Sequence, residues 1–187
     1  MNVNIDSQDI KCLSQRLATE IRREQIVSAA LKLIGENGPA ALNIADIADQ
    51  VGLVPSAIYR HFSGKKEILL AVNGLIKDRL LASVRNACQG TDDPLVQLHR
   101  LLFLHVEVAL KNTGLARYVF TTGTLAKGSR RKRKLFEGVR LYLDRVAEIF
   151  ASGQQKGQVQ KELNPDTLSF MFLGLVQPAI FLHQLGA

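Results

Sequence analysis

The chain has 187 residues, a formal net charge of +7 and a pI near 9.6. With 47% hydrophobic and 22% charged residues it is globular rather than disordered, and it is long enough for one large domain or two small ones. Cys12 and Cys88 form no CxxC motif, and the N-terminal residues lack the apolar core of a secretory signal, so we expect free thiols in a reducing cytoplasm.

The hydrophobic pattern is helical almost throughout, and no segment shows sustained strand alternation. Asn43 and Ser63 are predicted N-caps, Pro55 is suited to the first position of a helix, and Gly38 with Pro39 is predicted to end the first helix. The predicted fold class is therefore all-α. The expected helices cover residues 16–36, 44–50, 55–62, 65–88, 94–112, 115–125, 129–155 and 165–185.

Residues 43–62 have the layout of a helix-turn-helix, in which two short helices meet at a tight turn that contains Gly52. The apolar positions expected to face inward are Ile44, Ile47, Ala48, Val51, Leu53, Ile58 and Phe62. This leaves an outward face on the second helix that can enter a major groove, formed by Ser56, Ala57, Arg60 and His61.

The segment from about residue 22 to residue 71 resembles the DNA-binding domain of TetR-type (TetR/AcrR) transcriptional regulators. The matching positions are Ile26, Ala30, Leu33, Gly38, Ile47, Ala48, Val51, Gly52, Ile58, Tyr59, Phe62 and Lys65. The resemblance implies an N-terminal arm (residues 1–15), a helix-turn-helix domain (16–64) and a helical ligand-binding and dimerisation domain (65–187) whose linking helix starts near residue 65. It further implies a cytoplasmic homodimer that represses transcription from a pseudo-palindromic DNA operator until a small-molecule effector releases it.

The same resemblance implies roles for individual residues. Ser56 and Ala57 lie at base-reading positions, and Arg60 adds to the specificity. The residues at phosphate-contacting positions are Asn43, Tyr59, His61 and Lys65. Val54 departs from the family pattern because valine cannot cap a helix, which costs about 1 kcal/mol relative to Ser or Thr.

The excess positive charge lies outside this motif. Residues 1–85 hold 11 Lys and Arg against 9 Asp and Glu, residues 86–187 hold 13 against 8, and residues 127–134 alone hold six cations and no acid. Five adjacent cations, Arg130 to Lys134, oppose one another and the dipole of the helix that they start. Three interpretations stay open: a solvated helix start, an auxiliary patch for DNA phosphates, and a site for an anionic effector or partner.

The second domain is expected to hold an effector pocket and a dimer interface. The candidate pocket residues, each of which can equally be a core residue, are Phe103, His105, Tyr118, Thr121, Thr122, Tyr142, Phe170 and Gln177. The candidate dimer-interface residues, from an apolar stripe and the last helix, are Phe136, Val139, Leu143, Phe150, Leu168, Phe172, Leu175 and Val176.

The sequence also bears on two other classes of protein. A membrane-associated helical protein is the alternative, because residues 167–187 carry no formal charge, although Gln177, Pro178, His183 and Gln184 interrupt the segment. An enzyme is not expected, since no GxSxG, HExxH or CxxC motif occurs and residues 123–129 lack the lysine of a P-loop. No cofactor or metal is expected, because the four histidines lack metal-ligand spacing.

Overall fold

A computed structural model describes residues 7–111, 118–119, 122 and 129–184, with side chains described for residues 15–108, 110, 118–119, 122 and 129–175. The described chain is all-helical, as predicted. Its seven helices are α1 (Ser7–Ala41), α2 (Ile44–Gln50), α3 (Pro55–Ile58), α4 (Lys65–Cys88), α5 (Pro94–Lys111), α7 (Arg130–Gln155) and α8 (Pro165–Gln184). Most of the expected helix between residues 115 and 125 lies outside the described residues.

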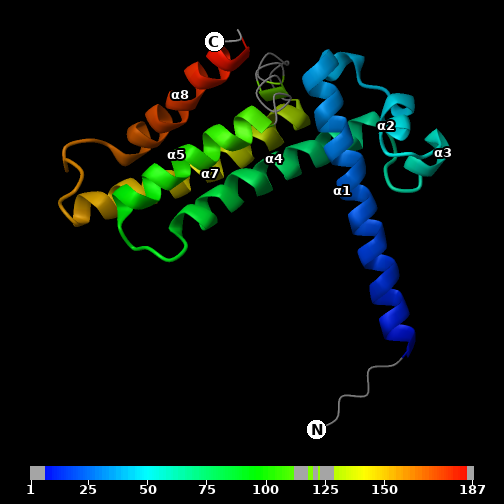
Figure 1. The fold of residues 1–187 in the computed structure, drawn as a ribbon, viewed down its shortest axis with the longest axis horizontal. Coiled ribbons are helices and arrows are strands. Elements are labelled where there is room, and N and C mark those ends of the chain that lie inside the picture. Colours follow the sequence, from blue (N-terminus) through cyan, green and yellow to red (C-terminus); the bar gives the residue numbers. More distant parts are fainter. Residues whose placement is uncertain (1–6, 112–117, 120–121, 123–128, 185–187) are drawn as a thin grey trace.

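The helices form two groups that share α4. Helix α1 packs against α2 and α4, and α2 packs against α3. Helix α4 leads away from this group and packs against α5 and α7, which α8 joins (Figure 1). The core is continuous across both groups, so the position of α4 is fixed from both ends.

Helix α1 begins nine residues earlier than the predicted start at Arg16. No glycine or proline occurs between residues 7 and 16, and this stretch is rich in residues that tolerate a helix, so nothing stops the helix there. Side chains along its first described turns are exposed, including Leu17 at 63%, and Figure 1 shows this end of α1 extending away from the other helices. The predicted break is confirmed at Gly38, whose φ of 79° and ψ of 161° are not helical.

The start of α4 differs from the prediction in one detail. Gly64, not Ser63, is the N-cap residue, and it makes no side-chain cap. The backbone N–H and the hydroxyl of Ser63 instead donate to Oε2 of Glu67, at 2.7 and 2.8 Å. Ser63 is therefore held by an acidic side chain that reaches back from the first turn of α4, an arrangement close to a capping box.

The buried face of α7 is formed by Leu135, Tyr142, Val146, Ala147 and Ile149. Phe136, a candidate dimer-interface residue, is 50% exposed in the protomer. Gly138 faces α4, and a Cβ atom there would lie only 3.1 Å from the Cβ of Lys77. The missing side chain lets the two helices approach closely along this line.

The membrane alternative concerns the uncharged C-terminal helix. Within the part of the chain that the structure describes, no helix combines the length and the apolar character needed to span a bilayer.

Candidate DNA-binding surface and ligand-domain interior

Helix α2 starts at the predicted cap. The Oδ1 atom of Asn43 accepts a hydrogen bond from the backbone N–H of Asp46 at 2.8 Å, and its Nδ2 atom donates to the Asp46 carboxylate at 2.7 Å. Gly52, at a φ of 66°, makes the turn, and the N–H of Leu53 returns to the carbonyl of Ala48 at 2.9 Å. The side chain of Asn43 is thus fully engaged in shaping the start of α2.

Helix α3 begins without a side-chain cap. Val54 is the N-cap residue and makes no capping bond, as predicted, while Pro55 occupies the first turn. The helix proper ends at Ile58, but the N–H of His61 and that of Phe62 still donate to the Ile58 carbonyl, at 2.9 and 3.0 Å. The chain therefore continues to turn as far as Phe62, the end predicted from the sequence.

The two sides of this helix pair differ as predicted. The side chains of Ile47, Ala48, Ile58 and Phe62 are buried, with at most 1% of their surface exposed. Ser56, Tyr59 and Arg60 are exposed on the other side, Tyr59 at 57%, and Ala57 is half-buried. A packed apolar side thus holds a short, polar and accessible helix at the surface.

Two of the predicted contact residues are less free than the sequence indicated. His61 is half-buried, and its Nδ1 atom is buried without a hydrogen-bond partner among the described residues. The Nζ atom of Lys65 donates to the carbonyl of Ala40 at 2.8 Å. Lys65 therefore ties the start of α4 to the end of α1, beside any role toward a phosphate.

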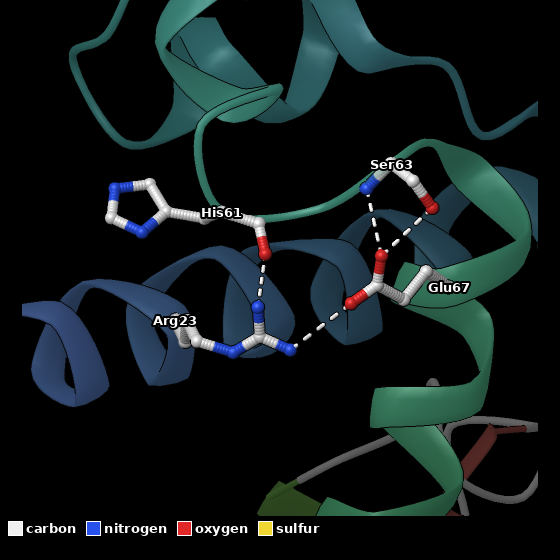
Figure 2. A network of polar contacts seen from close by, with 4 residues as sticks. All are labelled: Arg23, His61, Ser63 and Glu67. Carbon is white, nitrogen blue, oxygen red and sulfur yellow. Dashed lines mark hydrogen bonds and ion pairs between the residues drawn. The ribbon is translucent and has the colours of Figure 1, made fainter.

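A polar network that the sequence did not reveal connects α1, the end of α3 and α4. Arg23 lies at its centre: Nη1 donates to the His61 carbonyl, Nη2 is 3.3 Å from Oε1 of Glu67, and the guanidinium lies 4.0 Å from the centre of the Phe62 ring. Figure 2 shows how Glu67 uses its other carboxylate oxygen for Ser63. The guanidinium thus fixes the segment that follows the exposed helix.

The charge state of Glu67 fits this role. The backbone and hydroxyl hydrogen bonds from Ser63, and then the one from Arg23, hold its pKa below the ordinary value. A glutamate in the first turn of a helix is a capping motif that a sequence can reveal. The partnership with Arg23 is not of this kind, because 44 residues separate the two.

The interior of the α5, α7 and α8 group contains a buried polar pair. The Nδ1 atom of His105 lies 2.7 Å from the hydroxyl oxygen of Tyr142, and both side chains are buried. Burial lowers the pKa of His105 to about 4 and raises that of Tyr142, so both groups are neutral near pH 7.

A second buried polar cluster surrounds Tyr118. Its hydroxyl donates toward the Leu69 carbonyl at 3.0 Å and the Asn73 side-chain oxygen at 2.7 Å, and Asn73 Nδ2 donates to the carbonyl of Arg131 at 2.9 Å. Burial raises the pKa of Tyr118 to about 12, against a smaller opposing effect of the Arg131 charge. Thr122, also predicted for the pocket, is buried too.

The other pocket candidates do not join these clusters. Phe103 and Phe170 are 63% and 69% exposed, so their side chains lie at the surface of the protomer and not in its interior. Thr121 and the side chain of Gln177 lie outside the described residues. Four of the candidate pocket residues, His105, Tyr118, Thr122 and Tyr142, are therefore buried in the interior. The sequence pattern did not distinguish them from the exposed candidates Phe103 and Phe170.

The candidate interface residues also divide into two groups. Phe172 is buried in the protomer and packs edge-on against Phe150, with ring centres 6.2 Å apart, so it belongs to the core. Leu175 is 61% exposed, and Val139, Leu143 and Leu168 are half-buried, whereas the side chain of Val176 lies outside the described residues.

The described part of the chain offers no cluster of three or more His, Cys, Asp or Glu side chains arranged to hold a metal ion. Cys88 is a free thiol, and burial raises its pKa.

Comparison with known proteins agrees with this geometry. The family described as "Bacterial regulatory proteins, tetR family" matches residues 26–72, which include α2, α3, Ser63 and Glu67. The nucleoid occlusion factor SlmA of Aliivibrio fischeri is 27% identical over 129 residues, which cover 67% of this chain and 66%, just under two thirds, of that relative.

Solved structures share the fold over most of the chain. A TetR/AcrR-family regulator from Thermobifida fusca is 26% identical, with a TM-score of 0.62 and coverage of 87% of this chain and 84% of the other. FadR of Bacillus subtilis in complex with stearoyl-CoA has a TM-score of 0.68 at 21% identity, with 84% of each chain covered. AibR in complex with isovaleryl coenzyme A and operator DNA has a TM-score of 0.68 at 20% identity, with 83% of each chain covered.

The matched family consists of transcription regulators rather than enzymes, which confirms the prediction that this chain is not an enzyme. Together with the helix-turn-helix and the two-part helical fold, these matches show that the chain belongs to the tetR family of DNA-binding transcriptional regulators.

Proposed function

We propose that this protein is a ligand-responsive repressor, present in the cytoplasm, that binds a pseudo-palindromic DNA operator as a homodimer. The observation that carries the proposal is the exposed side of α3 and of the turn that follows it, where Ser56, Tyr59 and Arg60 are accessible while Ile58 and Phe62 are buried beneath them. A rigid support of this kind is what sequence-specific contact requires, because base contacts depend on a fixed register.

Within this proposal the outer residues divide into two kinds. Ser56, Ala57 and Arg60 read base edges, and Tyr59 donates to a phosphate. Asn43, His61 and Lys65 border the same surface and contact the backbone of the DNA while they also shape it, since Asn43 caps α2 and Lys65 holds the Ala40 carbonyl.

The homodimer is proposed to form through α8. Phe170, Met171 and Leu175 on this helix are 69%, 63% and 61% exposed, which is an unusual concentration of large apolar side chains on one surface of a protomer. A self-complementary surface of this kind is typical of a two-fold homodimer, which would present two copies of α3 to the two halves of an operator.

The effector is proposed to be an acyl-CoA thioester bound in the domain formed by residues 65–187. Two proteins of the same fold are complexes with acyl-coenzyme A molecules, stearoyl-CoA and isovaleryl coenzyme A. The neutral pair of His105 and Tyr142 supplies buried hydrogen-bonding groups that can orient a ligand in an otherwise apolar interior.

The DNA-binding part is tested by fluorescence anisotropy with a labelled fragment of the protein's own promoter region. Tyr59→Phe removes a hydroxyl, and Arg60→Gln replaces the guanidinium by a shorter neutral amide. Both side chains are exposed, so neither change should alter the fold. We expect Arg60→Gln to weaken specific binding by about tenfold or more, since one good base contact is worth about 1–3 kcal/mol. Lys161→Gln, an exposed cation between α7 and α8, is the control. Equal affinity in Arg60→Gln and wild type would contradict the placement of α3 in the groove.

The dimer is tested separately by multi-angle light scattering of the double variant Phe170→Glu/Leu175→Glu. If α8 forms the interface, this variant is monomeric and binds the operator more weakly than the wild type. A variant that stays dimeric would exclude this face of α8. Addition of stearoyl-CoA to the wild-type complex should release the DNA, and unchanged anisotropy would remove that acyl-CoA as an effector.

A further inference from the structure

A cavity of about 400 Å³ lies between the first turns of α4 and α7. Leu69 and Leu70 supply its apolar surface, and Lys66 approaches it from α4. From the α7 side it is lined by Ser129, Arg130 and Arg131. Among the described residues, the charged ones that line this cavity are all cations, and two of them come from the basic cluster whose role the sequence left open.

The basic cluster divides into outer and inner cations. On the outer side, Glu137 forms ion pairs with Arg133, at 3.8 Å, and with Lys134, at 2.8 Å. These two cations lower the pKa of the glutamate. Lys132 lies 5.9 Å from the centre of the Phe136 ring. Among the described residues no carboxylate pairs with Arg130, Arg131 or Lys66, the cations at the cavity.

Arg131 is the most enclosed of the three. Its Nε atom is buried and has no hydrogen-bond partner in the described part of the chain. Its charge acts on the pKa of Tyr118, a fully buried residue, so the guanidinium lies on the inner side of α7. A buried N–H of a charged group without a partner costs free energy, which an anionic ligand would recover.

The dipole of helix α7 also favours an anion at the cavity. The N-terminus of α7 carries a partial positive charge, so Arg130 and Arg131 are unfavourable there unless negative charge is bound nearby. Ser129 caps the helix by accepting from the N–H of Lys132. A phosphate in the cavity would be attracted by the dipole and by three cations at once.

We propose that this cavity binds the phosphate-bearing end of the acyl-CoA effector, with Arg130, Arg131 and Lys66 as its phosphate ligands. This inference rests on the acyl-CoA effector proposed above, and it deepens that proposal by naming the subsite. Leu69 and Leu70 adjoin the cations, so the site suits an amphiphile whose polar end is anionic. The partly apolar lining and the buried Nε of Arg131 favour a small amphiphilic ligand over the phosphates of DNA, which need accessible cations.

The chain offers a matched pair of variants. Arg130→Gln/Arg131→Gln removes two charges at the cavity, and Arg133→Gln/Lys134→Gln removes two from the outer side of the same helix turn. The first pair leaves the bond from Asn73 in place, because that bond uses the backbone carbonyl of Arg131. Circular dichroism melts check that both variants are folded.

Binding of stearoyl-CoA, stearate and free coenzyme A to each protein is measured by isothermal titration calorimetry. We expect Arg130→Gln/Arg131→Gln to lose tenfold or more in affinity for stearoyl-CoA and for coenzyme A, with no more than a twofold change for stearate. Arg133→Gln/Lys134→Gln should stay within about threefold of wild type for all the ligands. This pattern would support the phosphate subsite.

The other outcomes overturn it in distinguishable ways. Equal stearoyl-CoA affinity in wild type and both variants would show that the phosphates bind elsewhere, while the acyl-CoA effector itself would stand. A wild type that binds promoter DNA but none of the three ligands would reject both the effector class and the subsite. A loss of promoter affinity in Arg130→Gln/Arg131→Gln without a loss of stearoyl-CoA affinity would assign these cations to DNA.

Discussion

Acidification is expected to destabilise the folded protein through His105 in helix α5. Burial lowers the pKa of this imidazole from an ordinary 6.5 to about 4, and its hydrogen-bonded neighbour Tyr142 is equally buried. The unfolded chain therefore binds a proton near pH 6.5, whereas the folded protein resists it until about pH 4. The contribution of His105 to the free energy of unfolding should thus be constant above about pH 7. It should decrease as the pH falls from about 6.5 to about 4.

The size of the effect follows from the two pKa values. Because the unfolded state binds the proton more readily than the folded state, the free energy of unfolding falls by about 2 kcal/mol at pH 5 and by about 3 kcal/mol below pH 4. For a chain of this length 1 kcal/mol corresponds to roughly 2–4 °C in Tm, so the loss at pH 5 is roughly 4–8 °C. This is a large fraction of the stability of a typical domain, which is about 5–15 kcal/mol.

Thermal melts followed by circular dichroism between pH 7.5 and 5 would measure this loss in wild type and in His105→Gln. Glutamine keeps a polar group beside Tyr142 but does not titrate, so the variant should show a smaller fall in Tm, by roughly 4–8 °C at pH 5. His99→Gln changes an exposed histidine of the same helix and is expected to follow the wild type. Parallel Tm curves for wild type and His105→Gln would refute the reasoning, because other groups would then carry the pH dependence.

Three further changes test the packing and the caps. Asn43→Ala should lower the free energy of unfolding by about 1 kcal/mol in urea titrations, since α2 loses its cap, and an unchanged midpoint would mean that the cap adds nothing. Tyr118→Phe should cost about 1–3 kcal/mol in the same titration, because the single hydroxyl proton shared by two buried acceptors is lost, and a neutral result would imply that water replaces the hydroxyl. Gly153→Ala should lower Tm, because the added Cβ would lie 2.8 Å from Cγ2 of Val159. Gly74→Ala is the control: it has open space around it and should be neutral or stabilising by up to about 1 kcal/mol. Equal Tm values for the two variants would contradict the tight contact at Gly153.

Local features of this protein were predictable because they depend on neighbouring residues. The cap at Asn43, the turn at Gly52 and the uncapped start at Val54 each follow from side chains within three or four positions. The inward face of the helix pair was predictable for the same reason, since its apolar residues repeat with the helical period. Arg140 and Asp144, which pair at 3.3 Å, are a local interaction of the same kind, because residues four positions apart lie on one face of a helix.

The sequence alone could not decide between neighbouring positions that were equally suitable locally. Leu135 and Phe136 are adjacent apolar residues of α7, and only the packed structure shows that Leu135 is buried whereas Phe136 is 50% exposed and accessible for the proposed dimer interface. Likewise, Ser63 was a reasonable cap in isolation, but Glu67 reaches back to it and Gly64 takes the cap position. Periodicity shows that a face exists, and packing decides which face is used.

The helical character of the chain, the helix-turn-helix in its N-terminal part and the concentration of the net positive charge in one cluster outside it could all be predicted from the sequence. The contacts of Arg23 with the His61 carbonyl and Glu67, and the division of the cluster between Glu137 on the outer side and a cavity on the inner side, emerged only in the folded protein. The physical reason is distance along the chain. Helix formation is governed by interactions over a few residues, whereas a guanidinium finds its carboxylate 44 residues away only after the helices have packed.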